Sequence, residues 1–278
     1  MVHMTRPEIA LMCMEKYAGI KTVAGAFQQY GFAAASFEYN DDPIFQNMLT
    51  GLGFAYGLAC TIRLYKACGL NFEAPVCSTW IWLNRSTSGR SGDSPMGFQH
   101  LQQVADANLM VARTVIYLYI MSLLGCCWCI EQPSSSLLEK HVAFQWLCKQ
   151  TRVYRVFVWI GSYGHDCCKP TFLYSNYKFF HKLYLPLPCR EWTSNMVKRY
   201  IDSNGIPRIC GDSDLKASQH YPRRFGCAVA ECFLDHYEEV RQHVKETREE
   251  LQRAPRKEAK DPGFAKLANL RQVIKELQ

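Results

Sequence analysis

The segment over residues 9–38 constrains the fold of this chain more than any other stretch. It opens with an apolar run that is typical of a buried strand, passes through a turn at residues 15–20, and continues as an amphipathic helix that ends at Gly31. A second strand follows and ends on the acid Glu38. In a nucleotide-type pocket with this order of elements, the turn backbone approaches the ligand at a helix N-terminus and the acid binds ribose hydroxyls.

The segments that follow alternate between helical and strand-like patterns. Helices are expected at residues 50–68, 101–124 and 137–149, and short strands at residues 70–74, 126–130 and 152–160. This alternation predicts an α/β fold with a Rossmann-like, mainly parallel sheet and helices on both faces. Ligands of such sheets bind at the carboxyl ends of the strands. Four side chains with useful chemistry fall at those predicted ends: Glu15, Glu38, Cys77 and Glu131.

Charge and composition divide the chain into three parts. Residues 1–160 are expected to form the α/β core, residues 161–227 a basic, aromatic region that completes or caps it, and residues 228–278 a charged helical tail. Residues 148–227 hold 13 Lys/Arg and 5 Asp/Glu, a net charge of +8. Such a basic block predicts a surface that faces a polyanion such as nucleic acid, although a solvated surface that only aids solubility gives the same pattern.

The longest apolar run, residues 114–130, is only just long enough to span a membrane. Gly125 divides the run and no basic cluster flanks it, so we expect a buried helix that leads into a buried strand, and no membrane contact. The first eight residues are polar and include Pro7, which does not fit a secretory leader. We therefore expect reduced cysteines and an intracellular protein, located in the nucleus or the cytoplasm.

Three short motifs carry a family resemblance. They are the turn Glu15-Lys16-Tyr17-Ala18-Gly19-Ile20, the loop Ala74-Pro75-Val76-Cys77-Ser78, and the strand end Ile130-Glu131-Gln132-Pro133. Together with the polar loop at residues 84–97, their order and spacing over residues 11–138 resemble the cytosine-5 DNA methyltransferases, which use S-adenosylmethionine. The sequence departs from the family pattern at several positions. Lys21 and Thr22 replace two glycines, Val76 separates the proline from the cysteine, and Gln132 replaces an asparagine.

The resemblance implies a class I methyltransferase sheet and a role for each matching residue. The expected S-adenosylmethionine site consists of Tyr17, Ala18, Gly19, Ile20, Glu38 and Pro75. Cys77 would add to carbon 6 of cytosine, while Glu131 would support nitrogen 3 of a base flipped out of its stack. The expected substrate contacts are Ser78 after the cysteine, and Asn84 and Arg90 from the polar loop. The charge of the basic region, apart from the resemblance, adds Arg223 and Arg224 as expected contacts to nucleic acid.

Alternatives remain open at this stage. Cys77 can be a packing residue, and Glu131 can cap the helix that follows it. The chain can therefore be a methyltransferase-like fold without turnover that binds nucleic acid or a protein partner, or a methyltransferase of small molecules. Four residues, His165, Cys167, Cys168 and Cys189, offer zinc-type ligands but lack a paired Cys-x-x-Cys spacing, so no metal site is predicted.

Overall fold

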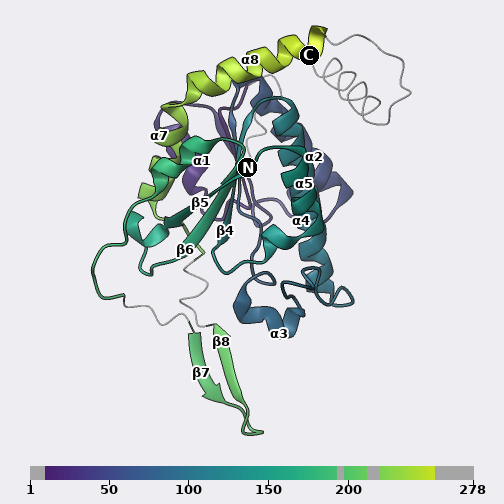
Figure 1. The fold of residues 1–278 in the computed structure, drawn as a ribbon, viewed down its shortest axis with the longest axis vertical. Helices are drawn as coiled ribbons and strands as arrows, with labels where there is room; N and C mark the ends of the chain where they lie inside the picture. The colour runs from purple at the N-terminus through teal and green to yellow at the C-terminus, as the bar shows by residue number, and fades with distance from the viewer. Residues whose placement is uncertain (1–9, 193–196, 212–218, 254–278) are drawn as a thin grey trace.

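The computed structural model describes residues 10–192, 197–211 and 219–253 (Figure 1). Its centre is a six-stranded sheet with the strand order β2-β1-β3-β4-β6-β5. The first four strands in this order are parallel, and β6 runs antiparallel to both of its neighbours. The strands are β1 (Cys13–Lys16), β2 (Ala34–Phe37), β3 (Leu70–Glu73), β4 (Cys127–Pro133), β5 (Tyr154–Trp159) and β6 (Pro170–Ser175). The chain therefore has the mixed α/β architecture with a mostly parallel sheet that the sequence predicts.

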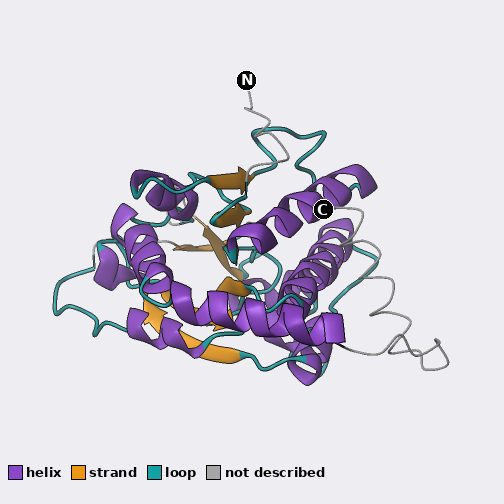
Figure 2. Ribbon diagram, turned by 90° about the horizontal axis from the view of Figure 1, so that it is seen from above, coloured by secondary structure: helices purple, strands orange, loops and turns teal. Residues whose placement is uncertain are grey.

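Helices cover both faces of the sheet (Figure 2). One group is α1 (Thr22–Gln29) and α7 (Arg223–Leu234), and the other is α2 (Gly51–Ala67), α4 (Gln102–Leu123) and α5 (Val142–Gln150). The connection through α1 leads from β1 to β2, whereas the connection through α2 leads back across β1 to β3. Right-handed crossovers in opposite directions place their helices on opposite faces. The carboxyl ends of β1 and β3 therefore border a topological switch point, where ligands of such sheets bind.

The remaining elements lie at the periphery. The hairpin of β7 (Val197–Ile201) and β8 (Pro207–Gly211) extends away from the body, and α8 (Tyr237–Arg253) lies across the opposite end (Figure 1). The short helices are η1 (Trp82–Asn84), α3 (Arg85–Ser88), η2 (Leu138–Lys140), η3 (Ile160–Tyr163) and η4 (Lys178–Leu183).

Helix α4 shows why the long apolar run is part of the core. Its buried residues include Val104, Val111, Val115 and Leu118, which recur at helical spacing and so form one apolar stripe. Each fully buried side chain of this size contributes about 1.5–3 kcal/mol relative to an exposed one. Among the described residues, α4 alone is long and apolar enough to cross a membrane, and half of its most apolar window is buried in the protein.

The basic region does not stand apart from the core. Its strand β6 lies inside the sheet between β4 and β5, and its helix η4 carries buried Phe179 and Phe180. The predicted boundary of the tail at residue 228 falls inside α7, which is not an exposed helix as expected. Its apolar side chains pack against α1, where Gly226 lies so close that an added Cβ would be 2.4 Å from the carbonyl oxygen of Thr22. The rest of the expected helical tail, residues 254–278, lies outside the described residues.

Strand β4 is longer than predicted and changes the position of Glu131. The apolar run ends at Ile130, but pairing with β6 extends the strand to Pro133, with Glu131 opposite Leu173. Glu131 is therefore a buried strand residue and does not cap a helix. All the cysteines that the structure describes are free thiols.

Candidate functional site

The turn between β1 and α1 meets the end of β2. Gly19 adopts φ +49°, a left-handed conformation that glycine reaches without strain, and its N–H donates to Glu38 Oε2 at 2.9 Å. An added Cβ at Gly19 would meet nothing within 4 Å beyond its two chain neighbours. Ala18 is buried, whereas Ile20 is 55% exposed. The structure therefore brings Gly19 and Glu38 together, as predicted, with open space on the outer side of the turn.

Lys21 and Thr22 stand where the cytosine-5 methyltransferases that the sequence resembles have glycines. Their side chains do not fill the space beside Gly19. The ammonium group of Lys21 pairs with Asp41 at 2.8 Å, and the hydroxyl of Thr22 donates to the carbonyl oxygen of Tyr221 at 3.2 Å. Lys21 itself has φ 61°, so it adopts the left-handed conformation that glycine would favour. Both side chains are thus held by partners on other loops.

Glu15 lies at the end of β1 and faces α1. Its Oε2 accepts a 2.7 Å hydrogen bond from the N–H of Ala24, so the buried carboxyl satisfies a donor in the first turn of the helix. Burial raises the pKa of Glu15 to about 7, although the hydrogen bonds from the first-turn amides oppose this shift. Glu15 therefore anchors the helix that follows the turn.

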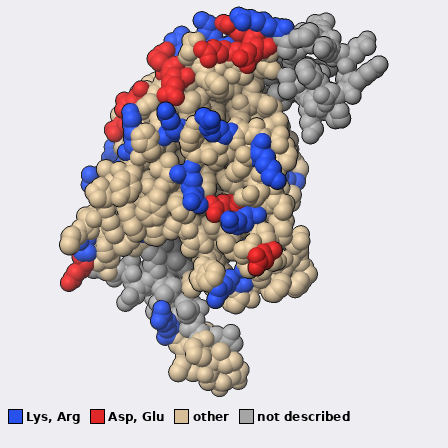
Figure 3. Space-filling view, viewed as in Figure 1, with Lys and Arg blue, Asp and Glu red and all other residues tan. Residues whose placement is uncertain are grey.

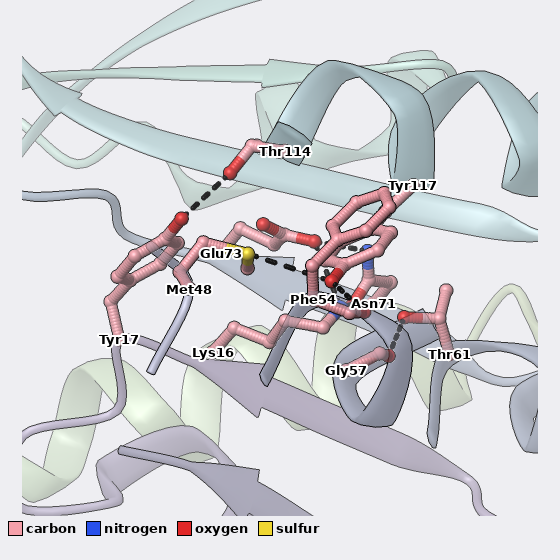
Figure 4. A network of polar contacts seen from close by, with 10 residues as sticks. All are labelled: Lys16, Tyr17, Met48, Phe54, Gly57, Thr61, Asn71, Glu73, Thr114 and Tyr117. Atoms are coloured by element: carbon pink, nitrogen blue, oxygen red, sulfur yellow. Dashed lines mark hydrogen bonds and ion pairs between the residues drawn. The ribbon is translucent and has the colours of Figure 1, made fainter. Parts of the chain in front are cut away.

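The side chain of Lys16 lies on the face of the sheet opposite to that of Glu15, and it joins β1 to β3 (Figure 4). Its ammonium group donates to Asn71 Oδ1 at 2.7 Å and to Glu73 Oε1 at 2.9 Å, and all three side chains are fully buried. The ammonium also lies 4.5 Å from the ring centroid of Tyr117 on α4. Because Lys16 and Glu73 are register partners at the strand ends, this ion pair fixes the two strands that border the switch point.

Tyr17 and Pro75 make contacts inside the protein. The hydroxyl of Tyr17 lies 3.0 Å from Thr114 Oγ1 on α4 (Figure 4), and its backbone has φ 56°. Pro75 is buried, and its carbonyl oxygen accepts a hydrogen bond from Gln132. Their roles in cofactor binding stay predictions.

Hydrogen bonds join the loop after β3 to the segment after β4. Gln132 Nε2 donates to the carbonyl oxygen of Pro75 at 2.7 Å, and the N–H of Trp82 donates to the carbonyl oxygen of Ser135 at 3.2 Å. The carboxylate of Glu131 acts electrostatically on the Cys77 thiol. Their shared catalytic role stays a prediction.

The environment of this pair suppresses ionisation. Burial raises the pKa of the Cys77 thiol to about 11, and Glu131 raises it further, while Lys169 lowers it. Burial also raises the pKa of Glu131, although Lys169 and hydrogen bonds from Tyr221 and Thr171 lower it. The cation that acts on the Cys77 thiol is Lys169. Glu131 Oε1 is buried without a hydrogen-bond partner among the described residues.

Lys169 and Tyr221 are site residues that the sequence reasoning missed. Lys169 precedes β6 in a left-handed conformation with φ 39°, and β6 lies directly beside β4. The ammonium group of Lys169 is 4.4 Å from the ring centroid of Tyr221, which leads into α7. The β-rich run that follows Lys169 was the available signal, because an extra strand beside β4 would bring this lysine to Glu131.

Of the predicted substrate residues after β3, Ser78 and Asn84 lie beside Cys77, whereas Arg90 is buried. Ser78 is exposed, and its carbonyl oxygen accepts from Asn84 Nδ2 at 2.6 Å, so these two residues lie together beside Cys77. Arg90 is only 2% exposed: its guanidinium donates to Asn108 Oδ1 and stacks 3.3 Å from the ring centroid of Trp80. Burial lowers the pKa of Arg90 to about 10. In this structure Arg90 holds the loop together and does not face solvent.

Arg223 and Arg224 are exposed in the first turn of α7. Arg223 donates to Gln29 Oε1 at 2.8 Å, so it lies beside the end of α1. Figure 3 shows Lys and Arg side chains scattered over one face of the body, with a mixed band of both charges along α8. Among the described residues, no three His, Cys, Asp or Glu side chains are placed to hold a metal ion.

The elements described above define a site by geometry alone. An open turn meets an acid at the ends of β1 and β2. The half-buried thiol of Cys77 follows β3, and the buried carboxyl group of Glu131 lies in β4. Comparisons with known protein families and with curated proteins find no match to this chain.

Proposed function

We propose that this chain is a divergent S-adenosylmethionine-dependent methyltransferase, with the class I sheet of such enzymes, that acts on cytosine in nucleic acid. The observation that carries the proposal is the buried carboxyl group of Glu131, whose Oε1 has no partner among the described residues and whose charge raises the pKa of the Cys77 thiol. A buried acid beside a thiol fits an acceptor that needs both a nucleophile and a proton donor. A flipped base presents carbon 6 and nitrogen 3 to two such groups at once.

The turn at Gly19 supports the cofactor assignment. Its outer side is open, and Glu38 offers carboxylate oxygens at the end of the neighbouring strand for ribose hydroxyls. Gly19, Ile20 and Glu38 would hold S-adenosylmethionine, and ribose binding would take Glu38 from the N–H of Gly19. When bound, the cofactor supplies an electrophilic methyl group.

The residues of the pocket divide the chemistry between them. The thiolate of Cys77 forms a bond to carbon 6 of the base, and Glu131 donates its proton to nitrogen 3, so that carbon 5 becomes nucleophilic. Because the charge of Glu131 raises the pKa of Cys77, protonation of Glu131 favours the thiolate. The positive charge of Lys169 also favours it. The active form therefore combines a protonated acid with an ionised thiol.

Two surface features support a nucleic-acid substrate. The ring of Trp82 is 55% exposed, and the guanidinium of Arg85 stacks 3.7 Å from its centroid, close to the loop of Cys77. Exposed aromatic and guanidinium planes stack on bases, and basic residues neutralise phosphates. Binding should therefore weaken steeply with salt.

A second candidate is a binding protein without turnover. The raised pKa of Cys77 favours it, because at neutral pH the unliganded site holds a thiol and not a thiolate. In this alternative the chain binds nucleic acid or a protein partner through the same surfaces and transfers no methyl group.

Calorimetry with S-adenosylmethionine, followed by transfer of a radiolabelled methyl group to cytosine-containing DNA and RNA, separates these functions. The proposal predicts binding, and label at carbon 5 of cytosine that is lost in Cys77→Ala but kept in Cys148→Ala, which changes an exposed cysteine. Gly19→Val should abolish binding, since a branched side chain is strained at a positive φ. Binding without transfer supports the second candidate, and no binding by the unmodified chain contradicts the cofactor assignment.

A further inference from the structure

One face of the paired strands β5 and β6 carries a row of aromatic rings. Alternate residues of a strand share a face, and here the opposite face packs into the core, where Val158 and Leu173 are fully buried. The residues of the aromatic face are Arg155, Phe157 and Trp159 on β5, paired in register with Tyr174, Phe172 and Pro170 on β6. Because β5 is the edge strand of the sheet, this face lies at the border of the molecule's central layer.

Three of these rings lie together and are partly open to solvent. The ring centroid of Phe157 is 4.9 Å from that of Trp159 and 5.7 Å from that of Phe172, and each of the three side chains is half-buried. Tyr174, by contrast, is buried against Phe144 of α5, with the ring centroids 5.2 Å apart. The cover that α5 gives to Tyr174 therefore does not extend fully over the other three rings.

An open cleft adjoins the aromatic face at its Tyr174 end. Arg155 and Tyr174 line it from the strands, Gln145 lines it from α5, and Glu139 lines it from η2. Glu139 Oε2 accepts from the guanidinium of Arg155 at 2.9 Å and from the hydroxyl of Tyr174 at 2.9 Å. Carboxylate, amide and guanidinium groups thus lie beside aromatic rings, and these are the groups that hydrogen bond to the edges of unpaired bases.

The approach to this face along β5 is basic. Residues 149–155 hold Lys149, Arg152 and Arg155 and no acidic residue, and all three cations are exposed. The guanidinium of Arg155 lies 4.7 Å from the ring centroid of Phe172. Arg155 also pairs with Glu139 of η2, so the net positive charge of this segment comes from Lys149 and Arg152. A partner that carries negative charge and planar apolar rings complements this surface.

We propose that the aromatic face of β5 and β6 binds single-stranded nucleic acid, with unpaired bases stacked on Phe157, Phe172 and Trp159. Lys149 and Arg152 neutralise phosphates of the same strand. Only a base outside a duplex offers its full face to a protein ring, and cations that interleave with rings follow the alternation of phosphate and base along one strand. A protein partner with an apolar surface would cover the rings but gives no reason for the cations.

This proposal goes beyond the proposed function. It places a contact for nucleic acid outside the pocket of Cys77 and Glu131, and it needs neither S-adenosylmethionine nor turnover. It holds equally for a methyltransferase and for a binding protein. Stacking tolerates any base, so we expect little sequence preference at this face.

The experiment measures the affinity of the full chain for a short fluorescein-labelled oligothymidylate by fluorescence anisotropy, without S-adenosylmethionine. A protein ring under a base contributes a factor of about 5 to 150 in affinity. Phe157→Leu keeps an apolar side chain of similar size but removes the ring, so it should weaken binding at least about 5-fold. The double variant Phe157→Leu with Phe172→Leu should weaken it further. Affinity for a duplex of the same length should not change in either variant.

Trp146→Leu is the matched control. Trp146 is also an exposed aromatic residue, 39% exposed, but it lies on α5 with its ring 4.8 Å from that of Tyr119, away from β5 and β6. Its replacement removes a surface ring without touching the aromatic face, so the affinity for oligothymidylate should stay unchanged.

A second pair of variants tests the charges without changing any packed side chain. Lys149→Gln with Arg152→Gln should reduce the slope of log affinity against log salt by about 1.4, because each phosphate contact on a single strand contributes about 0.7. Arg241→Gln with Lys245→Gln, which removes two exposed cations from α8, should leave the slope unchanged. This comparison stays available if the phenylalanine variants do not fold.

The proposal would be overturned if the unmodified chain does not bind oligothymidylate, if folded Phe157→Leu binds as well as the unmodified chain, or if Trp146→Leu weakens binding equally. A salt slope that is the same in both pairs of charge variants would also contradict it. Methyl transfer does not enter the measurement, so the two proposals fail separately. Single-strand binding through Phe157 in a chain without transfer leaves this proposal standing, and transfer with no effect of Phe157→Leu overturns this proposal alone.

Discussion

The side-chain amide of Gln132 donates a buried 2.7 Å hydrogen bond to the carbonyl oxygen of Pro75. This single contact joins the end of β4 to the loop after β3, and these two segments carry Glu131 and Cys77. Both partners are buried, so water cannot replace either group when the other is removed. The attachment of the Cys77 loop to β4 therefore depends in part on Gln132.

Gln132→Ala should destabilise the protein by about 1–3 kcal/mol, because it leaves a buried carbonyl oxygen without a donor. Urea denaturation measures the change. Gln145→Ala is the matched control: Gln145 Nε2 also donates to a backbone carbonyl, that of Glu139, but this contact is exposed, so the change should stay within about 0.5 kcal/mol. Equal changes in the free energy of unfolding for the two substitutions would show that the buried bond to Pro75 stabilises the protein no more than the exposed one.

The ionisation of Cys77 should respond in opposite directions to its two charged neighbours. With a pKa of about 11, about one thiol in a thousand is ionised at pH 8. Glu131→Gln removes a negative charge and should lower the thiol pKa, whereas Lys169→Met removes a positive charge and should raise it. Iodoacetamide labelling of Cys77 at pH 8, quantified by mass spectrometry, should be faster in the first variant and slower in the second. Identical rates would mean that neither group acts on the thiol.

Removing one partner of the buried Lys16–Glu73 pair should destabilise the protein strongly, whereas replacing both partners together should destabilise it less. Lys16→Met leaves the Glu73 carboxyl group buried without its cation, and such losses amount to about 3–5 kcal/mol. The double variant Lys16→Met with Glu73→Gln removes both charges and should recover part of that loss. Denaturation midpoints of the two variants test this. A double variant less stable than Lys16→Met would contradict the account.

Stability should fall as pH rises through the titration of Glu15. The folded-state pKa is about 7 and the ordinary value is 4.5, so the protonated carboxyl is favoured in the folded protein. Its contribution is fully present below about pH 4.5 and is lost as pH rises through 7, a total of about 3 kcal/mol. Free energies of unfolding between pH 4.5 and 8 should show this decline in the native sequence and a smaller decline in Glu15→Gln. Glu249→Gln on exposed α8 should match the native sequence.

Local patterns sufficed to predict most of the sheet and helices. Apolar runs and the helix-ending Gly31 indicate β1, α1 and β2 because each signal lies within its own element. The motifs after Gly69 and Leu124 likewise place Cys77 and Glu131 near strand ends, and in the structure the charge of Glu131 acts on the Cys77 thiol.

The parts that could not be predicted depend on contacts between distant segments. Strand β6 enters the sheet antiparallel to β4, and that pairing extends β4 through Glu131 and brings Lys169 to it. Tyr221, just before α7, places its ring against the same lysine from the far end of the chain. Arg90 lies in a polar loop that looks solvated, but Trp80 and Asn108 enclose its guanidinium. The spacing of residues along the chain does not indicate such contacts between distant segments.

Covalent trapping of Cys77 tests the central claim most directly. A 5-fluorinated cytosine in DNA accepts the thiolate and the methyl group but cannot release the enzyme, so a working site becomes linked to the DNA. The account predicts a cofactor-dependent adduct whose DNA-linked peptide contains Cys77, present in Cys148→Ser and absent in Cys77→Ser. A protein that binds S-adenosylmethionine and this DNA yet forms no adduct at Cys77 would contradict it.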